Sequence, residues 1–389
     1  KRAGVTRKEK GNKIMREILI KPQLHKFGSF REFAGEFGLG ERDLVITNEY
    51  IYEPFMKECG LNCKFVFQEK FGAGEPSEEM ITDIFSALDP GEYDRVVAVG
   101  GGAVMDIGKL LSLKRVGSVH DLYFKKVDVI PEKELIALPT TCGTGSEVTN
   151  ISVAIVRDES GKTTKLGLVS DLLIPGTVCL IPEFLKTLPY TPFASSAIDA
   201  LIHAVESYLS PSRATMTSEL FGVKAMELIL EGFRRIGEQG PEARFEYMDE
   251  FLTAACYAGI AFLQAGCATV HAMSFPLGGT YHVPHGESNY ALFGKVLEKY
   301  DTIKPDGKIK EFRKTIARIL GGSEKDAIAN LAALEEKILH LKPLREYGFK
   351  EKDIEAFADS VLKNQQRLVV NSYVPLTKDL IAEIYRETH

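Results

Sequence analysis

The sequence has few cysteines and no long apolar run in its 389 residues. Six cysteines are too few for a disulfide scaffold in a chain of this length, which favours a reducing, cytoplasmic compartment. The longest apolar runs, such as residues 96–99 and 135–138, have the length of a β-strand. A membrane helix needs about 20 apolar residues, so we expect a protein that does not span a membrane.

The sequence also lacks an excess of positive charge. Its 48 Lys and Arg residues against 54 Asp and Glu residues give a formal net charge of −6 at pH 7. This balance gives no general electrostatic reason to bind nucleic acid or anionic lipid, and a small-molecule partner is expected instead. The content of 44% hydrophobic and 26% charged residues is that of a globular protein with a large core, which excludes a disordered or collagen-like chain.

The first part of the chain has the pattern of an α/β domain. Met15 is a candidate natural start, so residues 1–14 are an expected leader and the domain is predicted over residues 15–185. Short β-branched runs alternate there with helical patterns, which is typical of βαβ units and a largely parallel sheet. Strands are predicted over residues 44–47, 63–67, 95–99, 134–138, 151–156, 165–169 and 177–180. Helices are predicted over residues 52–59, 77–88 and 105–114.

The second part, residues 186–389, is predicted to be an all-helical domain, because strand-like alternation gives way to long helical periodicities. Pro182, Pro189 and Pro192 interrupt both patterns and indicate the boundary. The predicted helices cover residues 193–209, 218–238, 244–263, 308–320, 327–341 and 354–368.

Two loops in the first domain carry ligand-binding patterns. Gly100, Gly101 and Gly102 form a turn between a buried strand and a helix, a geometry that presents unpaired N–H groups to an anion such as a pyrophosphate, although glycines there also serve tight packing. The loop over residues 138–150 follows the next strand with threonines, glycines and a serine. Both loops fall at the edge where open α/β sheets bind ligands, so we expect a nucleotide site there.

The helical domain holds a cluster of possible metal ligands. Asp199 and His203 are four residues apart and project from one face of an apolar helix. His271, His282 and His285 lie within fifteen residues of one another, and they are three of only eight histidines. One carboxylate with three histidine candidates can bind Fe²⁺ or Zn²⁺ and leave an open position for substrate, and ligand identity alone leaves the choice of metal open.

Four motifs together resemble the iron-containing, or group III, metal-dependent alcohol dehydrogenases. GGGAVMDIGK resembles the family pattern GGGSxxDxAK, and PTTCGTGSEVT resembles PTTxGTGSE. DALIHAVESY and HAMSFPLGGTYHVPHG are similar to the family motifs that contain the metal ligands, and all four occur in the family order. The resemblance implies a Rossmann-like N-terminal domain followed by an all-α metal-binding domain, the architecture shared with dehydroquinate synthase.

The resemblance also implies roles for individual residues. The metal ligands would be Asp199, His203, His271 and His285. A nicotinamide cofactor would place its pyrophosphate on the three glycines. The other residues implied to lie near the cofactor are Asp106, Thr140, Thr141, Thr144 and Lys165.

The sequence departs from the family pattern at two positions. Phe275 stands where many members have a second histidine, so His282 is a candidate to replace it in a proton relay, with a loop or capping role as the alternative. Asn48 stands where members that prefer NAD often carry an Asp for the ribose hydroxyls. NAD is the expected cofactor, and a neutral side chain there leaves NADP possible.

Several further segments, such as ADSVLKNQQRLVVNSY, resemble members that interconvert 4-hydroxybutyrate and succinate semialdehyde. Arg367 and His282 are candidates to bind the substrate carboxylate. Alternatives are another primary alcohol such as butanol or 1,3-propanediol, a non-redox enzyme similar to dehydroquinate synthase, and a binding protein without turnover. The residues from 199 to 289 keep their cations away from the ligand motifs, which disfavours the phosphorylated substrate of the non-redox enzyme. A homodimer is the family expectation.

Overall fold

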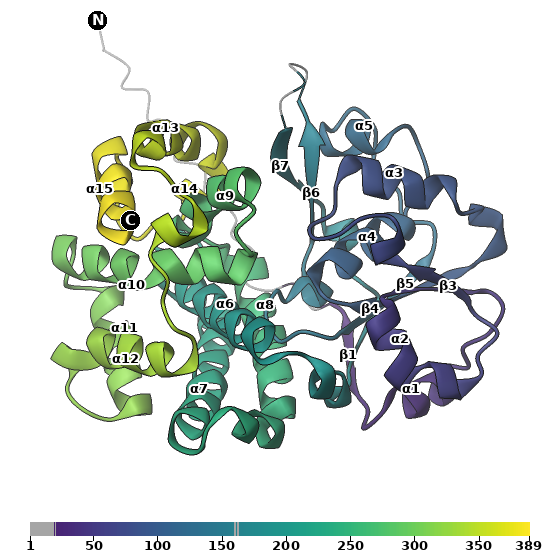
Figure 1. The fold of residues 1–389 in the computed structure, drawn as a ribbon, viewed down its shortest axis with the longest axis horizontal. Coiled ribbons are helices and arrows are strands. Elements are labelled where there is room, and N and C mark those ends of the chain that lie inside the picture. Colours follow the sequence, from purple (N-terminus) through teal and green to yellow (C-terminus); the bar gives the residue numbers. More distant parts are fainter. Residues whose placement is uncertain (1–18, 20, 159–160, 162) are drawn as a thin grey trace, which may run out of the picture.

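The computed structural model describes residue 19 and residues 21–158, 161 and 163–389, so the expected leader lies outside the described residues. The chain forms an α/β half and a helical half that lie side by side, as Figure 1 shows. The predicted boundary falls on a short 3-10 segment, Pro182–Thr187, between the last sheet strand and the first helix of the helical half. The expected fold class, an α/β domain followed by a helical one, is confirmed.

The α/β half is built on one parallel sheet of six strands in the order β1-β8-β5-β4-β2-β3. Every pair of neighbouring strands in it is parallel. The strands are β1 (Gln23–Lys26), β2 (Asp43–Thr47), β3 (Lys64–Phe67), β4 (Arg95–Gly100), β5 (Glu134–Pro139) and β8 (Thr177–Leu180). Sequence analysis missed β1, a short edge strand with an exposed and polar pattern.

Helices cover both faces of this sheet. Along β4, Val96 and Ala98 pack into one hydrophobic core, whereas Val97 and Val99 pack into another, because successive side chains point to opposite faces. The second core contains residues of α1 (Phe30–Glu36) and α2 (Glu49–Phe55). The first contains residues of α3 (Glu78–Ser86), α4 (Gly102–Leu111) and α5 (Val119–Tyr123).

Strands β6 (Ile151–Arg157) and β7 (Thr163–Val169) form a separate antiparallel pair and do not extend the parallel sheet. The alternating burial along β6 suits a ribbon with one covered face. The pair stands at the junction of the two halves, where β7 contacts helix α9 (Thr269–Tyr281; Figure 1).

The helical half is centred on three packed helices, α6 (Tyr190–Leu209), α7 (Met216–Gln239) and α8 (Met248–Ala265). The predicted helix over 244–263 begins as a 3-10 segment, Pro241–Tyr247. Sequence analysis missed α9 (Thr269–Tyr281), α10 (His285–Ile303) and α15 (Lys378–Thr388). The remaining helices are α11 (Lys308–Leu320), α12 (Ala327–Ile338), α13 (Ile354–Asn364) and α14 (Gln366–Val369).

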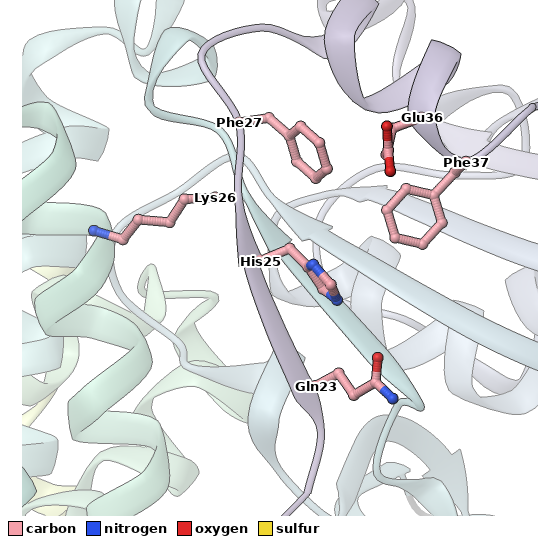
Figure 2. Close-up of a pocket in the computed structure, with 6 residues that line it drawn as sticks. All are labelled: Gln23, His25, Lys26, Phe27, Glu36 and Phe37. Carbon is pink, nitrogen blue, oxygen red and sulfur yellow. The ribbon is translucent and has the colours of Figure 1, made fainter.

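A polar contact at the edge strand joins the two halves. The ammonium of Lys26 on β1 donates to Asp249 and Thr253 on α8, each at 2.8 Å. Figure 2 shows Lys26 pointing towards the helices, away from His25 and Phe37, which line an open hollow of about 480 Å³ on the other side of the strand. This hollow belongs to β1 and α1, whereas the predicted ligands lie on other elements.

Among the described residues, no single helix has the length and apolar character needed to cross a membrane, although one pair of segments bent by 105°, Pro241–Ala265 with Thr269–Tyr281, passes the same test jointly.

Candidate metal and cofactor site

The structure brings the four predicted metal ligands together. Asp199 and His203 lie one turn apart on α6, His271 lies on α9, and His285 is the first residue of α10. One ligand atom from each of the four residues lies within 4.8 Å of all the others. Three helices therefore converge on one point, and Asp199, His203 and His271 are buried there.

The spacing of these atoms suits a divalent cation. The Asp199 carboxylate oxygens lie 3.7 Å from Nε2 of His271, 3.8 Å from Nε2 of His285 and 4.0 Å from Nδ1 of His203. These separations are too long for hydrogen bonds. In the described part of the chain, His203 Nδ1 is buried without a hydrogen-bond partner. Three imidazoles and one carboxylate form a donor set that fits Fe²⁺ or Zn²⁺.

The electrostatics of the cluster favour the ligand form at Asp199 and His285, whereas the pKa values of His203 and His271 are raised against the effect of burial, by Asp199 at His203 and by Cys267 and Glu206 at His271, so a cation must displace a proton there. Burial alone would raise the pKa of Asp199, but the three neighbouring histidines lower it to about 2. Burial lowers the pKa of His285 to about 3, and Lys165 adds to this effect, although Asp199 opposes it. An ionised carboxylate and a neutral imidazole are the ligand forms that bind a cation.

A carboxylate behind the cluster orients His271. Nδ1 of His271 lies 2.7 Å from Glu206, which also accepts the backbone N–H groups of Ala268 and Val270 at 2.9 and 2.6 Å. With its proton on Nδ1, the imidazole presents an unprotonated Nε2 to Asp199. Sequence analysis missed Glu206, although an acidic residue three positions after His203 in an apolar helix was a signal for it.

A second residue that sequence analysis missed is Asn289, one turn after His285 on α10. Its amide nitrogen donates to Asp199 at 2.7 Å and lies 3.1 Å from Nε2 of His271 and 3.3 Å from Nε2 of His285. Asn289 is fully buried, so this amide contacts three of the four clustered residues. No spacing rule in the sequence pointed to it.

Lys165 and Phe275 border the cluster on the side of the α/β half. The Phe275 ring lies 6.3 Å from the His285 ring, and the Lys165 ammonium lies 5.0 Å from the centre of the Phe275 ring. Lys165 also pairs with Glu75. The residue predicted to lie near the cofactor ribose thus extends from β7 towards the metal ligands.

His282, the predicted relay residue, ends helix α9 in the left-handed conformation with a φ of 54°. Its backbone N–H caps the carbonyl of Gly278, and its side chain is exposed. A backbone capping role is visible, and a catalytic role stays a prediction.

The predicted pyrophosphate turn and the loop after β5 face each other. Gly101 immediately precedes α4 as its N-cap, and no side chain caps that helix. A Cβ atom on Gly102 would lie 2.9 Å from Thr144, and one on Gly101 would lie 3.4 Å from Thr141. The glycines therefore let the loop after β5 pack closely against the N-terminus of α4, where backbone N–H groups without a side-chain cap are suited to bind a phosphate. Thr140 is buried, and its N–H donates to the carbonyl of Gly100.

Asp106 has partners within the protein. Its carboxylate accepts from the Ser146 hydroxyl at 2.6 Å and from the Val153 N–H at 2.9 Å, and it lies 3.6 Å from the Lys109 ammonium. Lys109 is fully buried and also donates to Thr149 and Ser146. These bonds tie α4 to the loop after β5 and to β6, so the visible role of Asp106 is to hold these segments together.

Asn48 follows β2, and its side chain holds the carboxylate of Glu69 beside it. Its amide donates to Glu69 at 2.8 Å and to Gln68 at 3.1 Å, and its oxygen accepts from Tyr50 at 3.2 Å. Glu69 is exposed and comes just after β3. A carboxylate from the end of the neighbouring strand therefore lies beside Asn48, a contact that the sequence did not reveal.

Comparison with known proteins agrees with this arrangement. Residues 24–182 match the family described as iron-containing alcohol dehydrogenase, and residues 193–389 match its C-terminal part. The chain belongs to the iron-containing alcohol dehydrogenase family. The four clustered ligands and the two facing loops of this iron-containing alcohol dehydrogenase lie within the matched residues.

Individual relatives cover nearly the whole length of this iron-containing alcohol dehydrogenase. The 4-hydroxybutyrate dehydrogenase of Clostridium kluyveri is 47% identical over 375 residues, which span 96% of this chain and all of the relative. The crystal structure of a 1,3-propanediol oxidoreductase is similar with a TM-score of 0.82 at 24% identity, covering 97% of this chain and 100% of that one. A sulfoacetaldehyde reductase from Bifidobacterium kashiwanohense, in complex with NAD⁺, has a TM-score of 0.81 at 20% identity, covering 96% and 99% of the chains. The last two similarities concern the fold.

Proposed function

We propose that this protein is an NAD-dependent 4-hydroxybutyrate dehydrogenase. In this reaction 4-hydroxybutyrate gives a hydride to NAD⁺ and a proton to solvent, and succinate semialdehyde and NADH result. The observation that carries the proposal is the 47% identity to the Clostridium kluyveri enzyme over its full length. The intact cluster of Asp199, His203, His271 and His285 supports it.

The ligand cluster defines the reacting centre of the proposed enzyme. A divalent metal, Fe²⁺ by family or Zn²⁺, would supply Lewis-acid stabilisation of negative charge on the substrate oxygen. Hydrogen bonds within the protein orient two of the four donors, because Glu206 contacts His271 and the Asn289 amide donates to Asp199. The Phe275 ring lies 6.3 Å from the His285 ring and provides an apolar neighbour on that side of the reacting centre.

The cofactor would lie on the α/β half and the ligand cluster on the helical half, so hydride transfer would take place between them. The N-terminus of α4 and the threonines of the loop after β5 would bind the pyrophosphate. The Glu69 carboxylate beside Asn48 would accept the ribose hydroxyls and repel a 2′-phosphate. This supports NAD over NADP.

The experiment that tests the proposal is reconstitution of the apoprotein with Fe²⁺ or Zn²⁺ without oxygen, followed by NADH and NADPH oxidation with succinate semialdehyde. Butanal, which lacks the carboxylate, is the control substrate. We expect metal-dependent oxidation of NADH with a large preference for the carboxylated aldehyde. His271→Ala should lose both bound metal and turnover. Equal rates with the two aldehydes would reject the proposed substrate, and another primary alcohol would then replace it.

Three further expectations belong to this proposal. We place the domain boundary after residue 185, so that residues 15–185 bind the cofactor and residues 186–389 bind the metal. A homodimer is the expected assembly, which sedimentation equilibrium would test. A cytoplasmic location follows from the free state of all six cysteines and the supply of reduced cofactor there.

A further inference from the structure

Arg367 lies on the short helix α14, which packs against the helix of His271, and its charge has no partner. Among the residues that the structure describes, the guanidinium makes neither a hydrogen bond nor an ion pair. By contrast, Arg386 on α15 pairs with Glu355. A guanidinium carries five N–H donors and no acceptor, so one held without a partner near a reacting centre is suited to bind an anion.

Contacts around α14 place Arg367 between the two halves. The Asn371 amide donates to the carbonyl of Cys267 at 3.0 Å and holds the end of α14 on the turn that precedes His271. From α14 the Arg367 side chain reaches β7, where its terminal nitrogen lies 4.0 Å from the position of a Cβ atom on Gly167. Figure 1 shows α14, α9 and β7 close to one another at the junction.

The same face of β7 also faces the ligand cluster. Lys165 and Gly167 are two residues apart, so their Cβ directions point to one side of the strand. Lys165 lies over Phe275 near His285, and Arg367 lies against Gly167, about 7 Å further along the strand. An extended four-carbon hydroxy acid is on the order of 6 Å from its hydroxyl to its carboxylate. The distance along β7 between Lys165, which lies near the metal ligands, and Gly167, beside which the Arg367 guanidinium lies, is therefore of the order of the length of such a substrate.

The surroundings of Arg367 add positive charge. The residue is exposed to solvent, and burial by neighbouring protein lowers the pKa of its guanidinium. Cys267 opposes this change in pKa and Arg213 adds to it. Arg213 itself donates to the carbonyl of Gln264 at 3.2 Å, at the end of α8. None of the groups that perturb Arg367 is a carboxylate.

We infer that the Arg367 guanidinium binds the carboxylate of the substrate and that Arg213 adds positive charge to this site. The pair thereby selects hydroxy acids and their aldehydes over uncharged alcohols. This assignment rests on the proposed function. Lys165 is less available for this task because it is nearly buried and pairs with Glu75. His282, the other candidate from the sequence, is exposed beyond the end of α9.

The test compares two aldehydes in the metal-loaded enzyme and its Arg367→Met variant. We expect kcat/KM for succinate semialdehyde to fall about 100-fold, mainly through KM, because a charged hydrogen-bonded pair is lost. For butanal, kcat/KM of the variant should stay within about threefold of the wild-type value. Arg367→Lys should recover part of the loss, since it keeps the charge without the bidentate geometry. Arg386→Met, at a matched arginine on α15, should leave kcat/KM unchanged for both aldehydes.

An equilibrium measurement separates binding from turnover. Succinate binding to the enzyme with NADH, followed by cofactor fluorescence, should weaken at least tenfold in Arg367→Met while metal content and NADH affinity stay unchanged. The inference would be overturned if Arg367→Met keeps the preference for succinate semialdehyde, or if its kcat/KM falls equally for both aldehydes. If Arg367→Met does not fold, Arg367→Lys and Arg367→Gln give the same comparison. A wild-type enzyme without preference would instead reject the proposed substrate, and succinate binding alone would then decide the role of Arg367.

Discussion

The Glu206 carboxylate lies 2.7 Å from Nδ1 of His271, on the side of the imidazole opposite Asp199. A carboxylate in this place keeps the proton on Nδ1 and leaves Nε2 free for a metal. The same carboxylate accepts two backbone N–H groups at the start of α9, so it also fixes where that helix begins. One buried residue thus sets both the position and the tautomer of a ligand.

Glu206→Gln should weaken metal binding by about 10- to 100-fold. An amide that donates towards Nδ1 favours the imidazole with its proton on Nε2, and that form cannot bind the cation. Competition with a chelator would measure the change. Glu336→Gln, at an exposed glutamate of α12 that bonds His340, is the control and should leave the affinity unchanged. Equal affinities for all three proteins would contradict the role given to Glu206.

Glu69 should determine the choice between NADH and NADPH. Its carboxylate is held by Asn48 at the end of β2, where the adenosine ribose is expected. Glu69→Gln should lower the NADH-to-NADPH ratio of kcat/KM about tenfold, because the repulsion of a 2′-phosphate is lost. Steady-state kinetics with both cofactors measure this ratio. Glu53→Gln, an exposed residue of α2 that pairs with Lys57, should leave it unchanged. An unchanged ratio in Glu69→Gln would remove Glu69 from the cofactor site.

The ligands could be predicted from the sequence because their signals are local. The four-residue spacing of Asp199 and His203 places them on one helix face, and the histidines near residue 280 are concentrated in a short segment. Glu206, Asn289 and Glu69 act through contacts between segments far apart in the chain, such as the 90 residues that separate Asn289 from Asp199. A single sequence contains no spacing that reveals such contacts.

The fold shows the same division between local and tertiary information. Strands β4 and β5 were predicted because buried parallel strands are continuous apolar runs. Helix α9 was missed because it contains Pro276 and Gly278, which normally interrupt a helix. Its packing against α10, α13 and α14 stabilises a segment that local propensity disfavours.

Gly259→Ala should destabilise the contact between the two halves. A Cβ atom on Gly259 would lie 2.8 Å from the carbonyl oxygen of Gly145, in the loop after β5, and Gly145 has a φ of 59°. Displacing that loop should cost about 1–3 kcal/mol of unfolding free energy and weaken NADH binding. Gly294→Ala on α10 has open space around it and should be neutral or slightly stabilising. Denaturant unfolding and cofactor fluorescence test both variants. A fully stable Gly259→Ala protein would show that the loop can move without cost.

Burial of Glu335 should make the free energy of unfolding fall as the pH rises from about 4.5 to about 8. Burial raises the pKa of this carboxyl on α12 to about 8, and one of its oxygens has no partner among the described residues. The folded protein then binds a proton that the unfolded chain releases near its ordinary pKa of 4.5. The contribution of Glu335 to the free energy of unfolding is therefore complete below pH 4.5. It is lost as the pH rises towards 8, by at most about 1.4 kcal/mol per pH unit.

Glu335→Gln removes this proton and keeps the shape of the side chain. We expect the variant and the wild type to have similar unfolding free energies at pH 5, and the variant to be more stable at pH 8.5. Denaturant unfolding at the two pH values measures the difference. Glu336→Gln, on the neighbouring exposed position, should give no gain at pH 8.5, because the partners of Glu336 lower the pKa of that carboxyl against the effect of burial. A gain of equal size at both pH values would mean that packing, and not ionisation of Glu335, limits the stability of this helix.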